Sequence, residues 1–275
     1  MQNKKYKLNK KNIFLFILLL IFIIIFINSL YNTFKWKKED KKINNEIEEI
    51  YDVIDISDIN DNEKTEIINQ VKEIPKFNPY WDYIKMNLIE VDFEKLRLKN
   101  LDTKGWLQVN GTNINYPFVQ SNNNEYYLTH SFNKTYNTAG WVFLDYRNNL
   151  KKIEKNTIIY AHGRLNNIMF GSLKNIIKSN WYENIENHII KLSTDYHNTL
   201  WQVFSVYSIP TTSDYIQTEF ARDNDYREFL NMLLKRSSYN FNTSVYESDN
   251  ILTLSTCYNE KEKVVLHAKL IKKSN

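Results

Sequence analysis

The chain of 275 residues has one cysteine, five glycines and four prolines. A single cysteine rules out an intrachain disulfide, and no H-E-x-x-H or H-x-x-x-H spacing supplies a metal-binding motif. The few glycines form no phosphate-binding loop, and no serine occupies a G-x-S-x-G turn. These absences leave the lone thiol as the most direct candidate for covalent chemistry.

The sequence also lacks an excess of basic residues outside its amino-terminal end. Residues 1–12 contain five lysines and no acidic residue, which leaves 31 basic against 32 acidic side chains in the remainder. A nucleic-acid-binding protein carries its positive charge on the folded domain. The charge distribution therefore argues against a nucleic-acid partner. An aromatic content of 15% supports a sizeable packed core.

An unbroken apolar run covers residues 13–27 and continues less strictly to 31. As a helix, residues 13–31 would span about 28 Å, close to the hydrocarbon thickness of a bilayer. The run is longer than a signal-peptide core and no A-x-A site follows, so we predict a transmembrane signal anchor, with cleavage as the alternative. The lysines of residues 1–12 favour a cytoplasmic tail, although five more lysines follow the run.

Residues 32–78 are charged and contain isoleucines at helical spacing: Ile43, Ile47, Ile50 and Ile54. The spacing predicts a helical stalk or a helix against the domain, and a solvated spacer is the alternative. Pro75 and Pro79 end the pattern, so we place a separate domain at 79–275.

Short apolar runs dominate this domain. Strand-like segments occur at 106–109, 114–119, 141–144, 157–160, 200–208, 251–257 and 264–271. Residues 225–236 have the pattern of one amphipathic helix. Many short strands with few helices predict an all-β-dominated barrel or sandwich.

Cys257 follows the apolar and hydroxyl-rich run 251–256. A lone thiol between two strand-like runs is a candidate nucleophile, but free cysteines are commonly buried as small hydrophobes. A thiol with a pKa of about 8.5 needs a base or a cationic partner near neutrality. His162 follows the strand-like run 157–160 and precedes Gly163, so it is placed to face a cleft; a surface histidine is the alternative.

A series of short motifs occurs in one order over residues 80–273: Gly105-Trp106-Leu107, Gly111-Thr112, Ile114-Asn115-Tyr116-Pro117, Val119-Gln120, Tyr126-Tyr127-Leu128, Phe143-Leu144-Asp145-Tyr146-Arg147, Ala161-His162-Gly163, Met169-Phe170-Gly171-Ser172-Leu173, Thr253-Leu254-Ser255-Thr256-Cys257 and His267-Ala268-Lys269-Leu270. This ordered set resembles the class B sortases of Gram-positive bacteria. The resemblance implies a β-barrel of about eight strands with N-terminal helices and a helix between late strands.

The resemblance also implies a membrane-anchored cysteine transpeptidase with an extracellular domain. Cys257 would attack the threonine carbonyl of an N-P-x-T-(N/G) sorting signal on a surface protein and form a thioacyl enzyme. His162 would protonate the leaving amine and deprotonate the incoming one. The acceptor would be an amino group of the peptidoglycan cross-bridge or its lipid-linked precursor, and no cofactor would be needed.

One position departs from the family pattern, in which an arginine on the strand after the cysteine binds the substrate or the oxyanion. Aligning on His267 puts Lys263 there, which keeps the charge but not the planar guanidinium fork. Lys263 could suffice, Arg164 could act instead, or the alignment could place the gap differently. Ser255 and Thr256 are candidates for lining the substrate cleft, or for satisfying backbone groups at the strand end.

Three alternatives to an active sortase remain open at this level. The Lys263 departure motivates a catalytically weak or inactive barrel that binds cell-wall peptides. A hydrolytic cysteine peptidase would share the thioacyl intermediate and release its product to water. An anchored all-β domain with an incidental cysteine would keep Cys257 far from His162.

Overall fold

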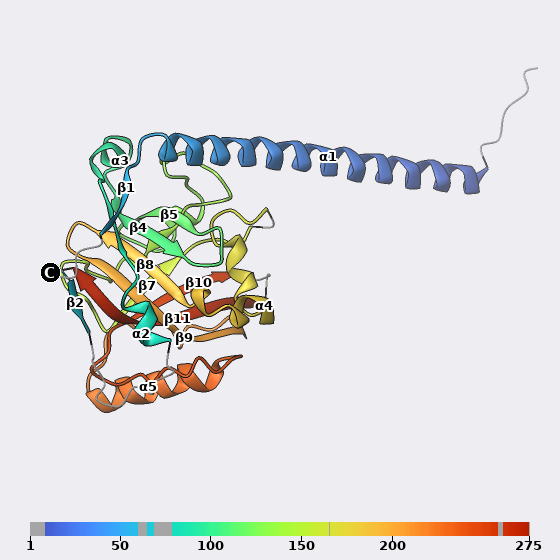
Figure 1. Cartoon of the computed structure of the whole chain (residues 1–275). Helices are drawn as coiled ribbons and strands as arrows, with labels where there is room; N and C mark the ends of the chain where they lie inside the picture. The colour runs from blue at the N-terminus through green and yellow to red at the C-terminus, as the bar shows by residue number, and fades with distance from the viewer. Residues whose placement is uncertain (1–8, 60–64, 69–78, 165, 258–260, 275) are drawn as a thin grey trace, which may run out of the picture. The chain divides into compact units, whose positions relative to one another are not determined.

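Figure 1 shows the computed structural model, which describes residues 9–59, 65–68, 79–164, 166–257 and 261–274. The chain divides into two compact units, residues 1–45 and 46–275. The elements in chain order are α1 (Lys10–Tyr51), β1 (Ile56–Ile59), β2 (Thr65–Ile67), α2 (Tyr80–Tyr83), β3 (Leu88–Val91), α3 (Glu94–Lys99), β4 (Thr103–Val109), β5 (Asn115–Val119), η2 (Tyr126–Leu128), β6 (Phe143–Leu144), β7 (Asn156–Tyr160), η3 (Gly171–Asn175), α4 (Ser179–Glu183), η4 (Ile185–Asn187), β8 (Ile189–Thr194), β9 (Asn198–Pro210), α5 (Asp223–Arg236), β10 (Ile251–Cys257) and β11 (Glu262–Ser274).

α1 is one continuous helix whose sequence contains neither glycine nor proline. The apolar side chains of residues 13–27 are exposed along it. By length and composition the helix could cross a membrane, and its most apolar window has a mean hydropathy of 3.2. A signal sequence near the N-terminus has the same composition, so the anchor at 13–31 stays a prediction.

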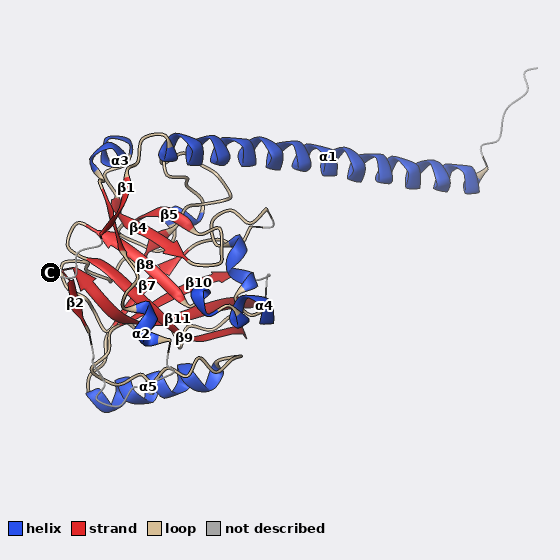
Figure 2. Cartoon of the chain, in the orientation of Figure 1, coloured by secondary structure: helices blue, strands red, loops and turns tan. Residues whose placement is uncertain are grey.

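Eight strands of the second unit close into a barrel, drawn in red in Figure 2. Their order is β10-β7-β6-β5-β4-β8-β9-β11, and β11 pairs with β10 to complete the ring. The β5–β6 and β7–β10 pairs are parallel, and the other pairs around the ring are antiparallel. This closure confirms the predicted eight-stranded barrel.

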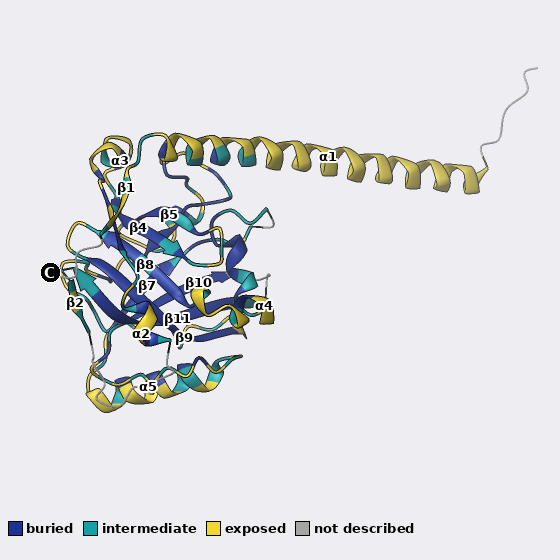
Figure 3. Cartoon of the chain, in the orientation of Figure 1, coloured by how far each residue is buried: buried dark blue, intermediate teal, exposed yellow. Residues whose placement is uncertain are grey.

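α5 covers the outside of the barrel over β9, β10 and β11 (Figure 3). Its buried side chains recur at helical spacing: Tyr226, Phe229, Leu230 and Leu233. They share one apolar cluster with Ile251 of β10 and Val265 of β11. Because α5 buries the outer face and the barrel interior buries the inner face, successive residues of these strands are buried rather than alternating between buried and exposed. The predicted late helix at 225–236 is confirmed.

Two short strands lie within the range 32–78, which the sequence predicts as a stalk. β1 pairs with β3 in a separate two-stranded sheet, and β2 extends the barrel sheet beside β11. At the end of α1, the ring of Tyr51 meets Trp106 edge-on with centroids 5.9 Å apart, and its hydroxyl donates to the carbonyl of Asn115. Part of the segment before residue 79 is therefore attached to the barrel.

Candidate active site

The backbone of Cys257 ends β10, between β11 and β7. β7 and β10 run parallel, with Ser255 paired to Tyr160 and the nitrogen of Ala161 3.5 Å from the carbonyl oxygen of Ser255. The C-terminal ends of both strands therefore lie at the same edge of the sheet. Cys257 is the last residue of β10, and His162 lies two residues after the end of β7. The side chain of Cys257 and residues 258–260, including Asn259, lie outside the described part of the chain.

The loop after β7 holds the backbone of His162 by local contacts. The amide of Phe170 donates to the carbonyl oxygen of His162 over 3.0 Å, and an isolated β-bridge joins Gly163 to Met169. Gly171 permits the return of this loop, since a Cβ there would lie 2.2 Å from the carbonyl oxygen of Arg164. These contacts join the two ends of the loop before η3 and fix the backbone of His162.

The half-buried imidazole of His162 has a hydrogen-bond partner among the described residues that defines its orientation. Its Nε2 lies 2.8 Å from the backbone carbonyl oxygen of Leu128, in η2. Because a carbonyl oxygen only accepts, Nε2 must carry a proton. Nδ1 is then the nitrogen that gains or loses a proton, which suits His162 to acid–base exchange with a second group.

Lys263 is the residue directly opposite Cys257 in the antiparallel β10–β11 ladder. It is half-buried and pairs on its other side with Ile209 of β9. Positions that oppose each other in such a ladder share one face of the sheet. The register thus puts a lysine position next to the cysteine position, while Arg164 lies in the loop after His162.

Ser255 and Thr256 are both buried. The hydroxyl of Ser255 lies 2.9 Å from that of Tyr215, in the segment between β9 and α5. Among the described residues, the buried Oγ1 of Thr256 has no hydrogen-bond partner. Ser255 therefore holds a neighbouring segment to β10, whereas the hydroxyl of Thr256 is available for a partner outside the described residues or for substrate.

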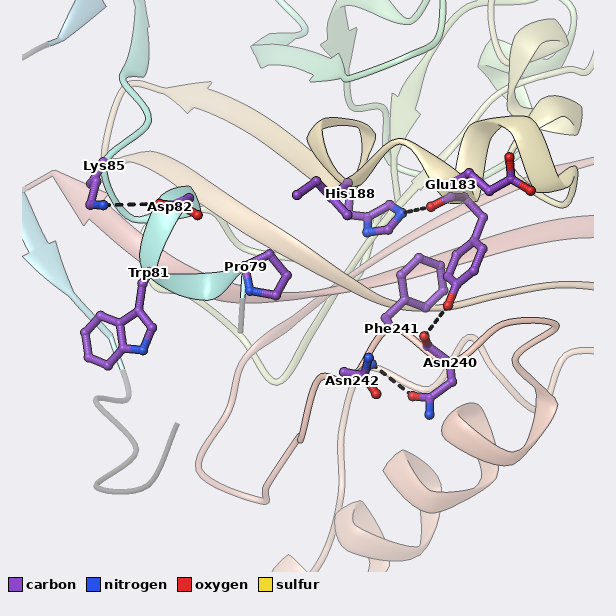
Figure 4. Close-up of a pocket in the computed structure, with 11 residues that line it drawn as sticks. Pro79, Trp81, Asp82, Lys85, Glu183, His188, Asn240, Phe241 and Asn242 are labelled. Atoms are coloured by element: carbon purple, nitrogen blue, oxygen red, sulfur yellow. Dashed lines mark hydrogen bonds and ion pairs between the residues drawn. The ribbon is translucent and has the colours of Figure 1, made fainter. Parts of the chain in front are cut away.

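A separate cavity of about 850 Å³ lies between α2, α4, η4 and residues 240–242 (Figure 4). His188 and Phe241 form part of its wall, with ring centroids 4.7 Å apart. Burial lowers the pKa of His188, and the hydrogen bond to the carbonyl of Tyr182 opposes that shift. None of the predicted reacting residues lines this cavity, so it is not the candidate active site.

The described residues contain no group of three or more His, Cys, Asp or Glu side chains that could hold a metal ion.

Two residues near this site have no recognisable signal in the sequence. Leu128 supplies a backbone carbonyl, an atom that every residue has, so its motif could not reveal the role. Tyr215 reaches Ser255 from 40 positions away, and no local pattern marks that pairing. The Tyr126-Tyr127-Leu128 motif was the only available signal for this neighbourhood.

Comparison with known proteins gives one consistent family. A family model described as a sortase domain matches residues 107–271. The chain is 38% identical over 190 residues to sortase B of Staphylococcus aureus (strain NCTC 8325 / PS 47), covering 68% of this chain and 77% of that protein. It is 35% identical over 186 residues to sortase B of Listeria monocytogenes (serovar 1/2a, strain ATCC BAA-679 / EGD-e), covering 66% and 74%. A solved Staphylococcus aureus sortase B–substrate complex matches with a TM-score of 0.61 and 38% identity, over 66% of this chain and 84% of that one.

Proposed function

Because the chain belongs to class B of the sortase family, whose members are cysteine transpeptidases, we propose that Cys257 and His162 cut a sorting signal and rejoin it to an amine. The substrate is an N-P-x-T-(N/G)-type signal on a surface protein, cut after the threonine. The acceptor is an amino group of peptidoglycan or of its lipid-linked precursor.

The first half-reaction starts from the Cys257 thiolate and a His162 that has taken the thiol proton on Nδ1. The thiolate sulfur attacks the threonine carbonyl carbon and forms a tetrahedral oxyanion. The C–N bond then breaks as His162 donates a proton from Nδ1 to the leaving nitrogen. The products are a thioacyl enzyme and a peptide amine. This assignment of Nδ1 is supported by the bond between Nε2 and the carbonyl of Leu128.

In the second half-reaction, the acceptor amine attacks the thioacyl carbon. Neutral His162 removes the proton from the attacking nitrogen, the C–S bond breaks, and the thiolate is regenerated. Lys263 stabilises the oxyanion in both steps through its positive charge. Its position opposite Cys257 in the ladder supports that role.

The observation that carries the proposal is the parallel pairing of β7 with β10. It brings the ends of two segments that are 95 positions apart to one sheet edge, one followed by His162 and the other ending in Cys257. A domain with an incidental cysteine would not require this coincidence.

The proposal includes a membrane location. Residues 1–12 form a cytoplasmic tail, α1 crosses the bilayer at 13–31, residues 32–78 bridge to the barrel, and the catalytic domain at 79–275 faces outward. The exposed apolar surface of α1 supports this topology. Surface proteins with sorting signals and cell-wall amines are reached on that side.

The test is to incubate the full chain in detergent with an N-P-Q-T-N-type peptide, with and without an amine acceptor, and to follow the products by mass spectrometry. Cys257→Ala and His162→Ala are the variants. We expect cleavage after threonine that requires both residues, and an amide product when the amine is present.

Other outcomes would favour the competing functions. Acid product alone, even at high amine concentration, would indicate a hydrolytic cysteine peptidase. Binding of the peptide without any cleavage would indicate a cell-wall-peptide-binding barrel.

A further inference from the structure

A buried carboxylate, Asp145, lies at the centre of a polar cluster that includes Tyr160, the last residue of β7. Its side chain is fully buried at the end of β6. Oδ1 accepts the amide and Nε of Arg147 at 3.0 and 2.8 Å. Oδ2 accepts Nη2 of Arg147, the hydroxyl of Tyr160 and Nδ2 of Asn124, at 2.7, 2.9 and 3.0 Å. Five donors thus converge on one carboxylate.

Two of these donors lead to His162 by separate routes. Tyr160 is the last residue of β7 and precedes His162 by two positions. Asn124 precedes η2, which supplies the Leu128 carbonyl that holds Nε2 of His162. Asn124 is itself fixed on both sides, because its Oδ1 also accepts the amide of Tyr146. The carboxylate therefore joins the strand that carries His162 to the element that orients its ring.

A third donor leads to β10. Nη2 of Arg147 also donates to the carbonyl oxygen of Ile216 over 3.0 Å. Ile216 follows Tyr215, whose hydroxyl contacts that of Ser255, two residues before Cys257. The Asp145–Arg147 ion pair therefore holds the segment of Tyr215 and Ile216, which contacts β10, close to the end of β6.

The energetics make the cluster rigid. Burial alone would raise the pKa of Asp145, but the hydrogen bonds from Arg147 and Tyr160 outweigh it, and the pKa lies below its ordinary value. A buried carboxylate with every acceptor site used is costly to rearrange, since each lost donor leaves an unsatisfied charge.

We propose that Asp145 is a positioning residue for the transpeptidation reaction. Its carboxylate sets the place and orientation of His162 relative to the end of β10, through Tyr160 and Asn124 on one side and Arg147 on the other. The inference rests on the proposed roles of His162 and Cys257. A displacement of about 1 Å between reacting groups is enough to lower a rate about 100-fold.

The test uses Asp145→Asn in the full chain, since asparagine keeps the shape and removes the charge. Asp249→Asn is the matched control, because Asp249 is also fully buried but lies before β10, at the end far from Cys257. The readouts are kcat and KM for peptide cleavage, and the pH dependence of alkylation by iodoacetamide. Alkylation reports on one site only, since Cys257 is the sole cysteine.

We expect Asp145→Asn to lower kcat about 10- to 100-fold with little change in KM. We also expect it to shift the alkylation midpoint by about 0.5 pH unit or more, because the influence of His162 on the thiol depends on their separation. Asp249→Asn should leave the midpoint and kcat unchanged. Tyr160→Phe removes one of the five donors, so it should change kcat and the alkylation midpoint in the same directions but by smaller amounts. It replaces Asp145→Asn as the test if that variant does not fold.

A folded Asp145→Asn or Tyr160→Phe variant with wild-type kcat and alkylation midpoint would overturn the inference and leave the proposed function standing. If the wild type cleaves no sorting peptide but the midpoint still moves in Asp145→Asn, the positioning role is supported and the substrate assignment fails.

Discussion

Lys263 stands directly opposite Cys257 in the β10–β11 ladder, at the sheet edge where β7 also ends. If Cys257 is the nucleophile, negative charge develops on the carbonyl oxygen of the attacked threonine, and a cation at this ladder position stabilises it. A lysine supplies that charge as a single point, whereas an arginine would add two parallel donors.

The first prediction concerns this charge. Lys263→Met should lower kcat about 10²- to 10³-fold, the usual cost of losing one oxyanion donor, and Lys263→Arg should equal or exceed the wild type. Steady-state peptide cleavage provides the measurement. Lys261→Met removes an exposed lysine two positions away and serves as the control. Equal rates for Lys263→Met and Lys261→Met would remove Lys263 from the mechanism.

The second prediction concerns the proton on His162. Since the carbonyl of Leu128 accepts from Nε2, the neutral imidazole should be protonated on Nε2 and bare on Nδ1. Nitrogen-15 NMR of histidine-labelled protein should show a protonated-type shift for Nε2 at high pH. His162→Gln identifies the resonance by its disappearance. A bare Nε2 would contradict the assigned direction of proton transfer.

The third prediction separates the two roles considered for Ser255. Its hydroxyl is buried against that of Tyr215, so Ser255→Ala should remove this hydrogen bond and lower the free energy of unfolding by about 0.5–1.5 kcal/mol. Tyr215→Phe should cost a similar amount, and the double variant should cost less than the sum. Denaturant titration measures all three. A large rise in KM for Ser255→Ala at unchanged stability would instead support a place in the substrate cleft.

The fourth prediction concerns pH and the fully buried His267. Burial, with the positive charge of Arg236 as a lesser cause, lowers its pKa to about 3. Its ring nitrogens are held by the hydroxyls of Thr253 and Tyr207 at 2.9 and 2.8 Å. In the unfolded chain the histidine has a pKa of about 6.5 and binds a proton below that pH. In the folded chain His267 stays neutral over the same range.

The stability contributed by neutral His267 is therefore present above pH 6.5 and is lost as the pH falls toward 3. The free energy of unfolding should decrease by up to about 1.4 kcal/mol per pH unit in this window. Burial also lowers the pKa values of His188 and His197, so these two residues likewise make the folded chain less stable as the pH falls. Urea titrations between pH 7 and pH 4 should give a shallower slope for His267→Gln than for the wild type. Parallel slopes would show that His267 does not titrate in this way.

Local patterns were enough for several features of this chain. The short apolar runs predicted strands, and the spacing of Phe229, Leu230 and Leu233 predicted α5, because burial on one face leaves a periodic trace in the sequence. Cys257 was the candidate nucleophile because it is the one cysteine in the sequence. The ordered motifs then supplied the family and, with it, the barrel.

Other features arise only from contacts between distant segments. β1 and β2 lie in a charged segment without a clear strand pattern, and they are ordered by pairing with β3 and β11. The strand pattern around His267 predicted either a structural or a solvent-facing histidine, and its full burial comes from contacts with Tyr207 on β9 and Thr253 on β10.

The sequence by itself determined the candidate reactive groups, the apolar N-terminal helix and the class of fold, since residue chemistry and periodicity are local properties. The tertiary structure alone decided that β7 pairs in parallel with β10, that a backbone carbonyl orients His162, and that Asp145 links the segments around them. Those relationships depend on barrel closure and on the need to satisfy buried polar atoms, which act across the chain and leave no periodic pattern in it.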